Sequence, residues 1–157
     1  MHFRRYNASD FAQLYAVEEL CFQPPFRFSR AYMRQLVRSS HAATWIAEEG
    51  AELLGFAIVE WSPDSRTAYI QTVEVTPGQR GQGIGGELLR RVEESAGAPG
   101  AHSIWLHVDV ENAAAIGLYE SRGYTRQGRE EHYYARHRAA FIYAKALANN
   151  SPPCAER

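Results

Sequence analysis

Cysteine is scarce in this chain: the 157 residues contain only Cys21 and Cys154. No Cys-x-x-Cys pair and no Cys/His spacing typical of zinc sites occurs, so we expect neither a disulfide framework nor a bound metal. A charge excess of one sign is also missing, with 17 basic and 18 acidic residues. Such a balance gives no general attraction to nucleic acid or to a membrane surface, and we expect neither as a partner.

Long hydrophobic runs are absent as well. No apolar stretch approaches the ~20 residues that a membrane-spanning helix needs, and the first six residues, MHFRRY, lack the apolar segment of a secretory signal peptide. We therefore expect a cytoplasmic protein. The chain has room for one domain with its own core, which we place at residues 1–148, followed by a disordered tail at 149–157. The domain is expected to be a monomer or a weak homodimer.

A glycine-dense, basic loop with the sequence TPGQRGQGIGG lies at residues 76–86. It follows an alternating, β-branched stretch, VEV, and precedes residues that share one helical face: Ile84, Leu88, Leu89 and Val92. The loop thus joins a strand to the N-terminus of a helix. Glycine leaves the backbone amides there unobstructed, the helix dipole favours an anion, and Arg80 adds a guanidinium group. The sequence therefore predicts a phosphate-binding loop.

Residue order separates three kinds of phosphate loop. A nucleotide P-loop ends in Gly-Lys-Ser/Thr, whereas here Gly85 is followed by a second glycine and a glutamate. The dinucleotide fingerprint G-x-G-x-x-G fits Gly81, Gly83 and Gly86. That fingerprint requires an acidic residue about 20 positions on, at the end of the next strand, and the first acid in that region is Asp109. Neither pattern matches.

The third pattern is Arg80-x-x-Gly83-x-Gly85 after a Val-x-Val-x-Pro strand. It resembles the acetyl-CoA pyrophosphate loop of the GCN5-related N-acetyltransferase (GNAT) superfamily. A second segment, NAAAIGLYESRGY at residues 112–124, is similar to that family's N-x-x-A-x-x-x-Y-x-x-x-G-F pattern. The resemblance covers residues 2–147, and within the superfamily the chain is most similar to RimI-type protein N-terminal acetyltransferases and the eukaryotic San-type enzyme.

Apolar periodicity and turn residues predict the order β-α-α-β-β-β-α-β-α-β-β. Strands are expected at residues 2–6, 43–48, 53–61, 67–76, 102–108, 124–134 and 138–146. Helices are expected after a cap at Ser9 or Asp10, after a cap at Ser29, at 82–96, and from Asn112 to the C′ glycine Gly123. Their apolar faces include Leu14, Val17, Leu20 and Cys21 in the first helix and Tyr32, Met33, Leu36 and Val37 in the second. This order resembles that of the superfamily and implies the GNAT fold, an α/β protein with a mixed sheet in a three-layer α/β/α arrangement.

The resemblance implies acetyl-CoA as cofactor, without a metal. It assigns cofactor binding to Val73, Val75, Arg80, Gly81, Gln82, Gly83, Ile84, Gly85, Gly86, Asn112 and Tyr119. Asn112 is an expected helix cap from the residues alone, and the family adds a hydrogen bond to the pantetheine arm. The family also assigns the backbone amide of Val75 to the oxyanion, at a point where the fourth and fifth strands splay apart.

Acetyl transfer from a thioester to an amine requires a neutral amine, stabilisation of an oxyanion and a proton for the thiolate. The resemblance assigns Tyr119 as the acid near the sulfur. His107 takes a position where RimI-type enzymes carry glutamate and the San-type enzyme histidine, and is expected to be the base, with Tyr69 assisting through water. Free imidazole has a pKa of about 6.5, which suits a base near neutral pH. The ordinary alternatives are a core aromatic for Tyr119 and a half-buried strand residue for His107.

Five aromatic residues are expected to line the acceptor side by the same resemblance: Phe26, Phe28, Tyr32, Tyr133 and Tyr134. Aromatic walls with phenol tips suit a peptide backbone and an apolar first side chain. The alternative is that these rings merely pack on one another. Arg129, Glu130 and Glu131 are expected to set the charge of the rim.

The predicted function is acetylation of α-amino groups of proteins or peptides by direct transfer, with lysine side chains as further acceptors. One alternative is a small-molecule amine acetyltransferase for polyamines, aminoglycosides or amino acids. The Tyr133-Tyr134 pair and the neutral net charge argue against a polycationic substrate. The other is a non-catalytic acetyl-CoA-binding module, which needs the glycine loop but neither His107 nor Tyr119.

Overall fold

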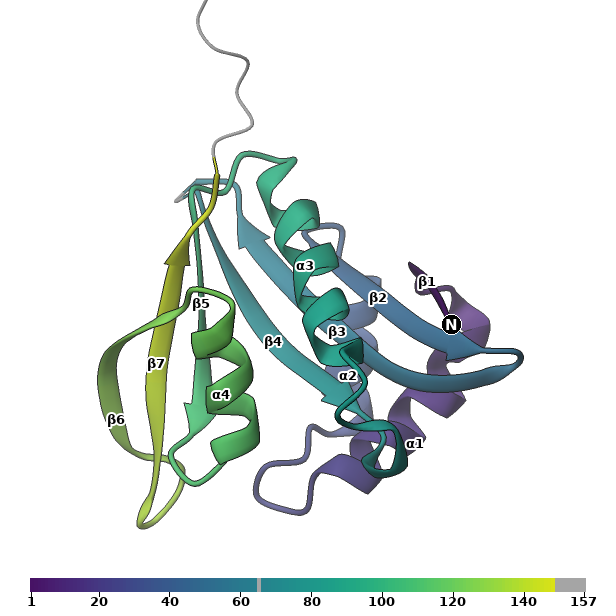
Figure 1. The fold of residues 1–157 in the computed structure, drawn as a ribbon, viewed down its shortest axis with the longest axis horizontal. Coiled ribbons are helices and arrows are strands. Elements are labelled where there is room, and N and C mark those ends of the chain that lie inside the picture. Colours follow the sequence, from purple (N-terminus) through teal and green to yellow (C-terminus); the bar gives the residue numbers. More distant parts are fainter. Residues whose placement is uncertain (65, 149–157) are drawn as a thin grey trace, which may run out of the picture.

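One mixed sheet forms the centre of the computed structural model, which describes residues 1–64 and 66–148 (Figure 1). Within these residues the sheet has seven strands in the order β1-β2-β3-β4-β5-β7-β6. The strands are β1 His2–Arg5, β2 Ala42–Glu49, β3 Glu52–Ser62, β4 Thr67–Val75, β5 Ser103–Asp109, β6 Thr125–Ala135 and β7 Arg138–Ala146. All neighbours are antiparallel except β4 and β5, which are parallel. The predicted tail with Cys154 lies outside the described residues.

Helices cover both faces of the sheet, which makes three layers. Helices α1 (Phe11–Cys21) and α2 (Arg30–Arg38) lie behind it in Figure 1, and α3 (Ile84–Gly97) and α4 (Ala113–Ser121) lie in front. Two apolar cores match these layers. Leu14 and Met33 pack with Phe56 behind the sheet, whereas Leu88 and Val92 belong to the core in front. The predicted element order is therefore observed.

The first two helices differ from the prediction in three details. A short 3-10 turn, η1 (Ala8–Asp10), precedes α1, and its cap is Asn7, whose Oδ1 accepts from the Ser9 amide at 3.1 Å. Leu20 is 64% exposed because it lies about 180° around the helix from buried Phe11 at 3.6 residues per turn. Tyr32 also points out of the core, and its hydroxyl donates to Gln71 Oε1 at 3.1 Å.

The strand that precedes the glycine loop ends at Val75, because Pro77 starts a second 3-10 turn, η2 (Pro77–Gln79). Helix α3 begins at Ile84, two residues later than predicted. The reason is Gly83, whose φ of 83° is left-handed and precedes the first helical residue. The chain thus makes a sharp entry into α3.

Strands β4 and β5 pair only near their starts, where residues Thr67–Tyr69 lie beside Ser103–Trp105. Beyond Tyr69 no further β4–β5 pairing is found in the described residues, and Figure 1 shows the two strands diverging. The sheet is therefore open between its fourth and fifth strands, as the resemblance implied.

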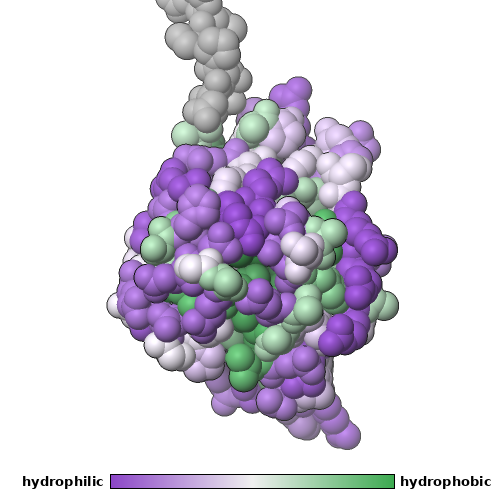
Figure 2. Space-filling model, turned by 90° about the vertical axis from the view of Figure 1, so that its right-hand side faces the viewer, coloured by the Kyte–Doolittle hydropathy of each residue, from purple (hydrophilic) through white to green (hydrophobic). Residues whose placement is uncertain are grey.

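The surface is largely hydrophilic on the side of β1 and β2, with smaller apolar patches between polar side chains (Figure 2). None of the helices in the part of the chain that the structure describes is long and apolar enough to cross a bilayer.

Candidate active site

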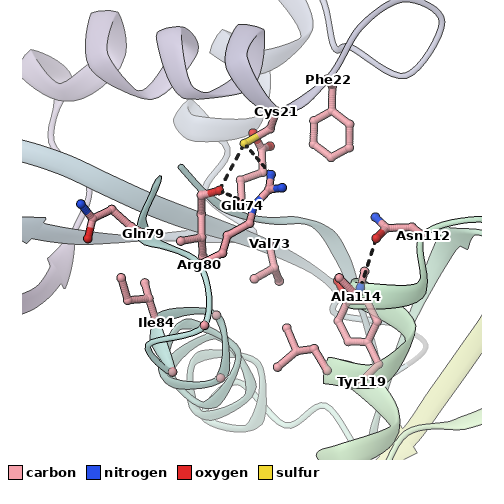
Figure 3. Close-up of a pocket in the computed structure, with 17 residues that line it drawn as sticks. Cys21, Phe22, Val73, Glu74, Gln79, Arg80, Ile84, Asn112, Ala114 and Tyr119 are labelled. Carbon is pink, nitrogen blue, oxygen red and sulfur yellow. Dashed lines mark hydrogen bonds between the residues drawn. The ribbon is translucent and has the colours of Figure 1, made fainter. Parts of the chain in front are cut away.

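A cleft of about 400 Å³ lies where β4 and β5 diverge (Figure 3). Its lining comes from the end of α1, the end of β4, the glycine loop, the start of α3 and helix α4. Ten of the eleven predicted cofactor residues line it: Val73, Val75, Arg80, Gly81, Gly83, Ile84, Gly85, Gly86, Asn112 and Tyr119. The eleventh, Gln82, is exposed beside the cleft, where its Nε2 donates to Gln79 Oε1 at 3.2 Å.

The glycine loop presents backbone N–H groups at the start of α3. Gly81 and Gly83 have φ angles of 84° and 83°, which favour glycine. No side chain caps α3, and the first amides of a helix have no acceptor within it, so those of Ile84 and Gly85 are available to an anion. A Cβ on Gly85 would lie 3.2 Å from the Leu118 side chain, so glycine at this position lets the start of α3 pack closely against α4.

Arg80 reaches across the mouth of the cleft. Its Nε donates to the Val75 carbonyl at 3.1 Å, and its Nη2 lies 3.7 Å from Cys21 Sγ. Burial, with Glu74 adding, raises the pKa of the Cys21 thiol to about 11, so this cysteine remains a neutral thiol. The guanidinium group is thus the charged group of the loop that faces the cleft.

The Val75 amide points into the opening. The next amide, that of Thr76, donates to Leu54 on β3 at 2.9 Å, and successive N–H groups of a strand point to opposite sides. The Val75 N–H therefore points away from β3, toward the missing β4–β5 pairing. The same alternation turns the Val73 amide to this side. These are the two backbone positions that the resemblance assigns to the cofactor.

Tyr119 lies both in the core and at the cleft, and its role as the acid stays a prediction. Its side chain is 6% exposed and packs in the core in front of the sheet, yet it also lines the cleft (Figure 3). Burial, and to a lesser degree the charge of Glu74, raises the pKa of its phenol, so the hydroxyl keeps its proton at neutral pH. Helix α4 is positioned by Asn112, whose Oδ1 accepts from the Ala115 amide at 3.1 Å.

Two buried carboxyl groups, Glu18 on α1 and Glu74 on β4, lie beside the cleft at 1% and 2% exposure. Glu18 Oε2 accepts from the Phe28 amide at 3.1 Å, and Glu74 Oε2 accepts from Thr72 Oγ1 at 2.7 Å. The Oε1 atom of each has no hydrogen-bond partner among the described residues. Burial and then the neighbouring Glu18 raise the pKa of Glu74 well above its ordinary value, so the fold favours the protonated form of Glu74.

Sequence reasoning did not identify this carboxyl pair. The signal was present for Glu74, because alternation along β4 places it on the same face as the buried residues Ala68, Ile70 and Thr72. Glu18 carried a similar signal, since it stands four residues after Leu14 and three before Cys21, on the apolar face of the first helix.

Tyr69, His107 and Glu130 form a continuous chain of contacts. Tyr69 Oη lies 2.8 Å from His107 Nδ1, and His107 Nε2 lies 2.7 Å from Glu130 Oε2. The imidazole is 9% exposed and stacks on Tyr133, with centroids 3.9 Å apart. Burial raises the pKa of Tyr69, so its phenol is neutral. Glu130 was expected only at the rim, but it reaches the imidazole, whereas Glu131 pairs with Arg129.

The acceptor side is a cavity of about 580 Å³ next to this chain of contacts, and its lining includes all five predicted aromatic residues. These rings also pack on one another: Phe26 on Tyr134 at 4.9 Å, Phe28 on Tyr32 at 5.1 Å, and Tyr133 on Tyr134 at 4.8 Å between centroids. Trp105 and Gln71, which were not predicted, line the same cavity. The five aromatic residues thus pack on one another and also line a cavity, and their contact with an acceptor stays a prediction.

An open mixed sheet with a glycine loop at its opening defines an acyltransferase-like α/β protein. A model of the Acetyltransferase (GNAT) family matches residues 11–124, which is more than half of the chain. The chain belongs to this family, and the predicted family and fold are confirmed.

Two relatives match about half of the chain. Streptothricin acetyltransferase of Streptomyces lavendulae is 39% identical over 83 residues, 53% of this chain and 44% of the relative. The ribosomal protein bS18 alanine N-acetyltransferase of Escherichia coli K12 is 33% identical over 86 residues, 55% of this chain and 57% of the relative. The matched part thus spans about half the length of these relatives. The crystal structure of the ribosomal-protein-S18-alanine N-acetyltransferase from Escherichia coli has a TM-score of 0.82 at 23% identity, covering 96% of this chain and 97% of that chain, and so has the same fold.

Proposed function

We propose that the protein is an acetyl-CoA-dependent N-acetyltransferase that acetylates α-amino groups of proteins or peptides by direct transfer. The observation that carries this proposal is the continuity of the site. The cleft at the glycine loop and a second cavity of about 440 Å³ share Val73, Asn112 and Tyr119. That second cavity shares Phe26 and His107 with the aromatic acceptor cavity. A path therefore runs from the loop, past the candidate catalytic groups, to the acceptor side.

The hydrogen-bonding groups that line the cleft fit acetyl-CoA. The free amides at the start of α3, with Arg80, suit the pyrophosphate. The backbone of Val73 faces the opening and suits an amide group of the pantetheine arm, which Asn112 also borders. Acetyl-CoA would supply the activated acetyl group.

The remaining chemistry belongs to side chains and amides of this chain. The Val75 N–H is directed into the opening, where it suits an oxyanion. The neutral Tyr119 phenol suits proton donation to the leaving thiolate. His107 and Tyr69 lie at the junction with the acceptor cavity and suit removal of the amine's proton. No covalent enzyme intermediate is needed.

The aromatic acceptor cavity supports a peptide as acceptor. Its rings offer flat apolar walls with hydroxyl tips to a backbone and a first side chain. The name of the Escherichia coli relative gives a protein alanine as its acceptor, which is consistent with this class. Lysine side chains are proposed as weaker acceptors.

A small-molecule amine is the second candidate acceptor, because the Streptomyces relative, named for streptothricin, is 39% identical over its matched part. A polycationic amine is best bound by carboxylates that are free to pair with it. Of the carboxyl groups near the acceptor cavity, Glu130 contacts His107 and Asp109 pairs with Arg138, whereas Glu60 accepts from the neutral side chain of Gln71. The aromatic lining favours the peptide, and Glu60 is the carboxyl group that a cationic amine would use.

An acetylation screen separates the candidates. Peptides that differ in their first two residues, each with a free or a blocked N-terminus, are compared with spermidine, free lysine and streptothricin. We expect free N-termini with an apolar start, such as Met-Leu or Met-Val, to be modified fastest. Faster turnover of blocked, lysine-containing peptides or of the small amines would refute the proposed acceptor. Binding of acetyl-CoA without turnover on any amine would favour the non-catalytic module.

A further inference from the structure

Both ring nitrogens of His107 are occupied by protein groups. Nδ1 lies 2.8 Å from Tyr69 Oη, and Nε2 lies 2.7 Å from Glu130 Oε2. The ring itself is covered by Tyr133 on one side and is 9% exposed. An acceptor amine can therefore reach neither nitrogen directly without displacing one of these partners.

The partners determine which nitrogen carries the proton. A carboxylate only accepts hydrogen bonds, so Nε2 must donate to Glu130. A neutral imidazole has a single N–H, which leaves Nδ1 as the acceptor. The Tyr69 phenol, which is neutral, then donates its O–H to Nδ1. The basic nitrogen of His107 thus faces Tyr69.

We propose that Glu130 is a positioning residue that holds His107 in its Nε2–H form, so that Nδ1 takes the acceptor's proton by way of the Tyr69 hydroxyl. This inference rests on the proposed acetyltransferase function. The ammonium group gives one proton to the Tyr69 oxygen, directly or through one water molecule, as the proton of Tyr69 passes to Nδ1. The amine becomes neutral, Tyr69 remains a phenol, and the imidazolium that forms lies beside the Glu130 carboxylate.

The groups around the imidazole single out Glu130 for this role. Tyr69 faces it from β4, and Tyr133 and Glu130 face it from β6. The next carboxylate along β6, Glu131, pairs with Arg129 and is exposed. Glu131 therefore offers a matched control with the same change of charge one residue away.

Nitrogen-15 NMR of histidine-labelled protein tests the positioning role without any substrate. The His107 signals are assigned by their loss in His107→Ala, and spectra are taken at a pH where the imidazoles are neutral. We expect the Nε2–H form in the wild type and in Glu131→Gln. In Glu130→Gln we expect a mixture of both forms, because an amide can accept from Nε2 or donate to it. An unchanged His107 spectrum in Glu130→Gln would overturn the proposal.

Steady-state kinetics with the peptide that the screen shows to be modified fastest test the proton transfer through Tyr69 to His107. We expect Glu130→Gln to lower kcat/KM about 3- to 10-fold, less than a fully buried charged hydrogen bond would give, because Glu130 is half exposed. The acidic limb of its rate profile should move to lower pH, since the imidazolium loses a carboxylate partner. The KM for acetyl-CoA should be unchanged, and Glu131→Gln should stay within about 2-fold of the wild type.

Variants of His107 and Tyr69, the other two residues of the proposed proton relay, complete the test. His107→Ala should lower kcat/KM by about 10²- to 10⁴-fold, and Tyr69→Phe should approach that loss. If both act on one proton, the double variant loses little more than His107→Ala alone. Wild-type kcat/KM in Tyr69→Phe or in Glu130→Gln would overturn the proposal. Absence of turnover by the wild type on every amine would refute the proposed function, and the NMR result would still decide the role of Glu130.

Discussion

The wild-type protein should lose stability as the pH rises, and replacement of Glu74 by glutamine should remove this loss. Burial, followed by the neighbouring Glu18 carboxyl, raises the pKa of Glu74 well above the ordinary value of 4.5. Between these two values the folded state holds a proton that the unfolded chain has lost. The free energy of unfolding of the wild type therefore falls as the pH rises above about 4.5 and continues to fall until Glu74 ionises in the folded state. Glutamine has no proton to lose.

The slope follows from linkage. One retained proton changes the free energy of unfolding by about 1.4 kcal/mol per pH unit, so between 4.5 and the raised pKa the wild type should lose up to about 1.4 kcal/mol per pH unit more than Glu74→Gln. With a urea dependence of about 2 kcal/mol per molar, the midpoints should drift apart by up to about 0.7 M per pH unit. The amide also suits the site, since Thr72 Oγ1 can still donate to its oxygen and its NH₂ can face Glu18.

Urea unfolding of the apo protein at several pH values measures this difference. Glu120 is exposed on α4, so Glu120→Gln is the control for the removal of one carboxylate. Its free energy of unfolding should change with pH as that of the wild type does. Equal losses of stability in the wild type and in Glu74→Gln over this pH range would show that Glu74 is ionised in the folded protein, and the argument from its burial would fail.

Three further outcomes are expected. Tyr119→Phe should lower kcat more than it raises KM in steady-state kinetics, because a proton for the thiolate is needed in the transition state; full kcat with weaker acetyl-CoA binding would remove its acid role. Acetyl-CoA at 100 times its Kd should stabilise the wild type by about 2.7 kcal/mol in thermal unfolding, and Gly83→Val should abolish most of this shift, since φ of 83° strains any side chain at the loop. Gly55→Ala should destabilise by about 1–3 kcal/mol, because its Cβ would lie 2.5 Å from the Glu74 carbonyl oxygen, whereas Gly78→Ala, with open space around it, should be near neutral in the same assay.

The fold was predictable because its signals are local. Alternation, caps and turn glycines mark the elements, and the loop around Gly83 carries the family's pattern within a few residues. What could not be predicted depends on contacts between distant segments. Glu18 and Glu74 meet across α1 and β4, where a glutamate in either element is more often solvated. Glu130 reaches His107 across β7, which lies between β6 and β5 in the sheet, and the β6–β7 register is shifted on both sides of Glu130, which no sequence pattern shows.

The opening between β4 and β5 amounts to a missing strand, and this decides what can fill it. Along the unpaired part of β4, the backbone N–H groups of Val73 and Val75 lack the neighbour that a complete sheet would give them, whereas the Val75 carbonyl accepts from Arg80 Nε. An apolar occupant would leave these polar groups buried and unsatisfied, which is unfavourable by about 1–3 kcal/mol for each. A slender molecule that carries amides at strand-like intervals would complete the ladder instead. The gap therefore favours a ligand with amide groups through hydrogen bonds to the backbone of β4, independently of the protein's side chains.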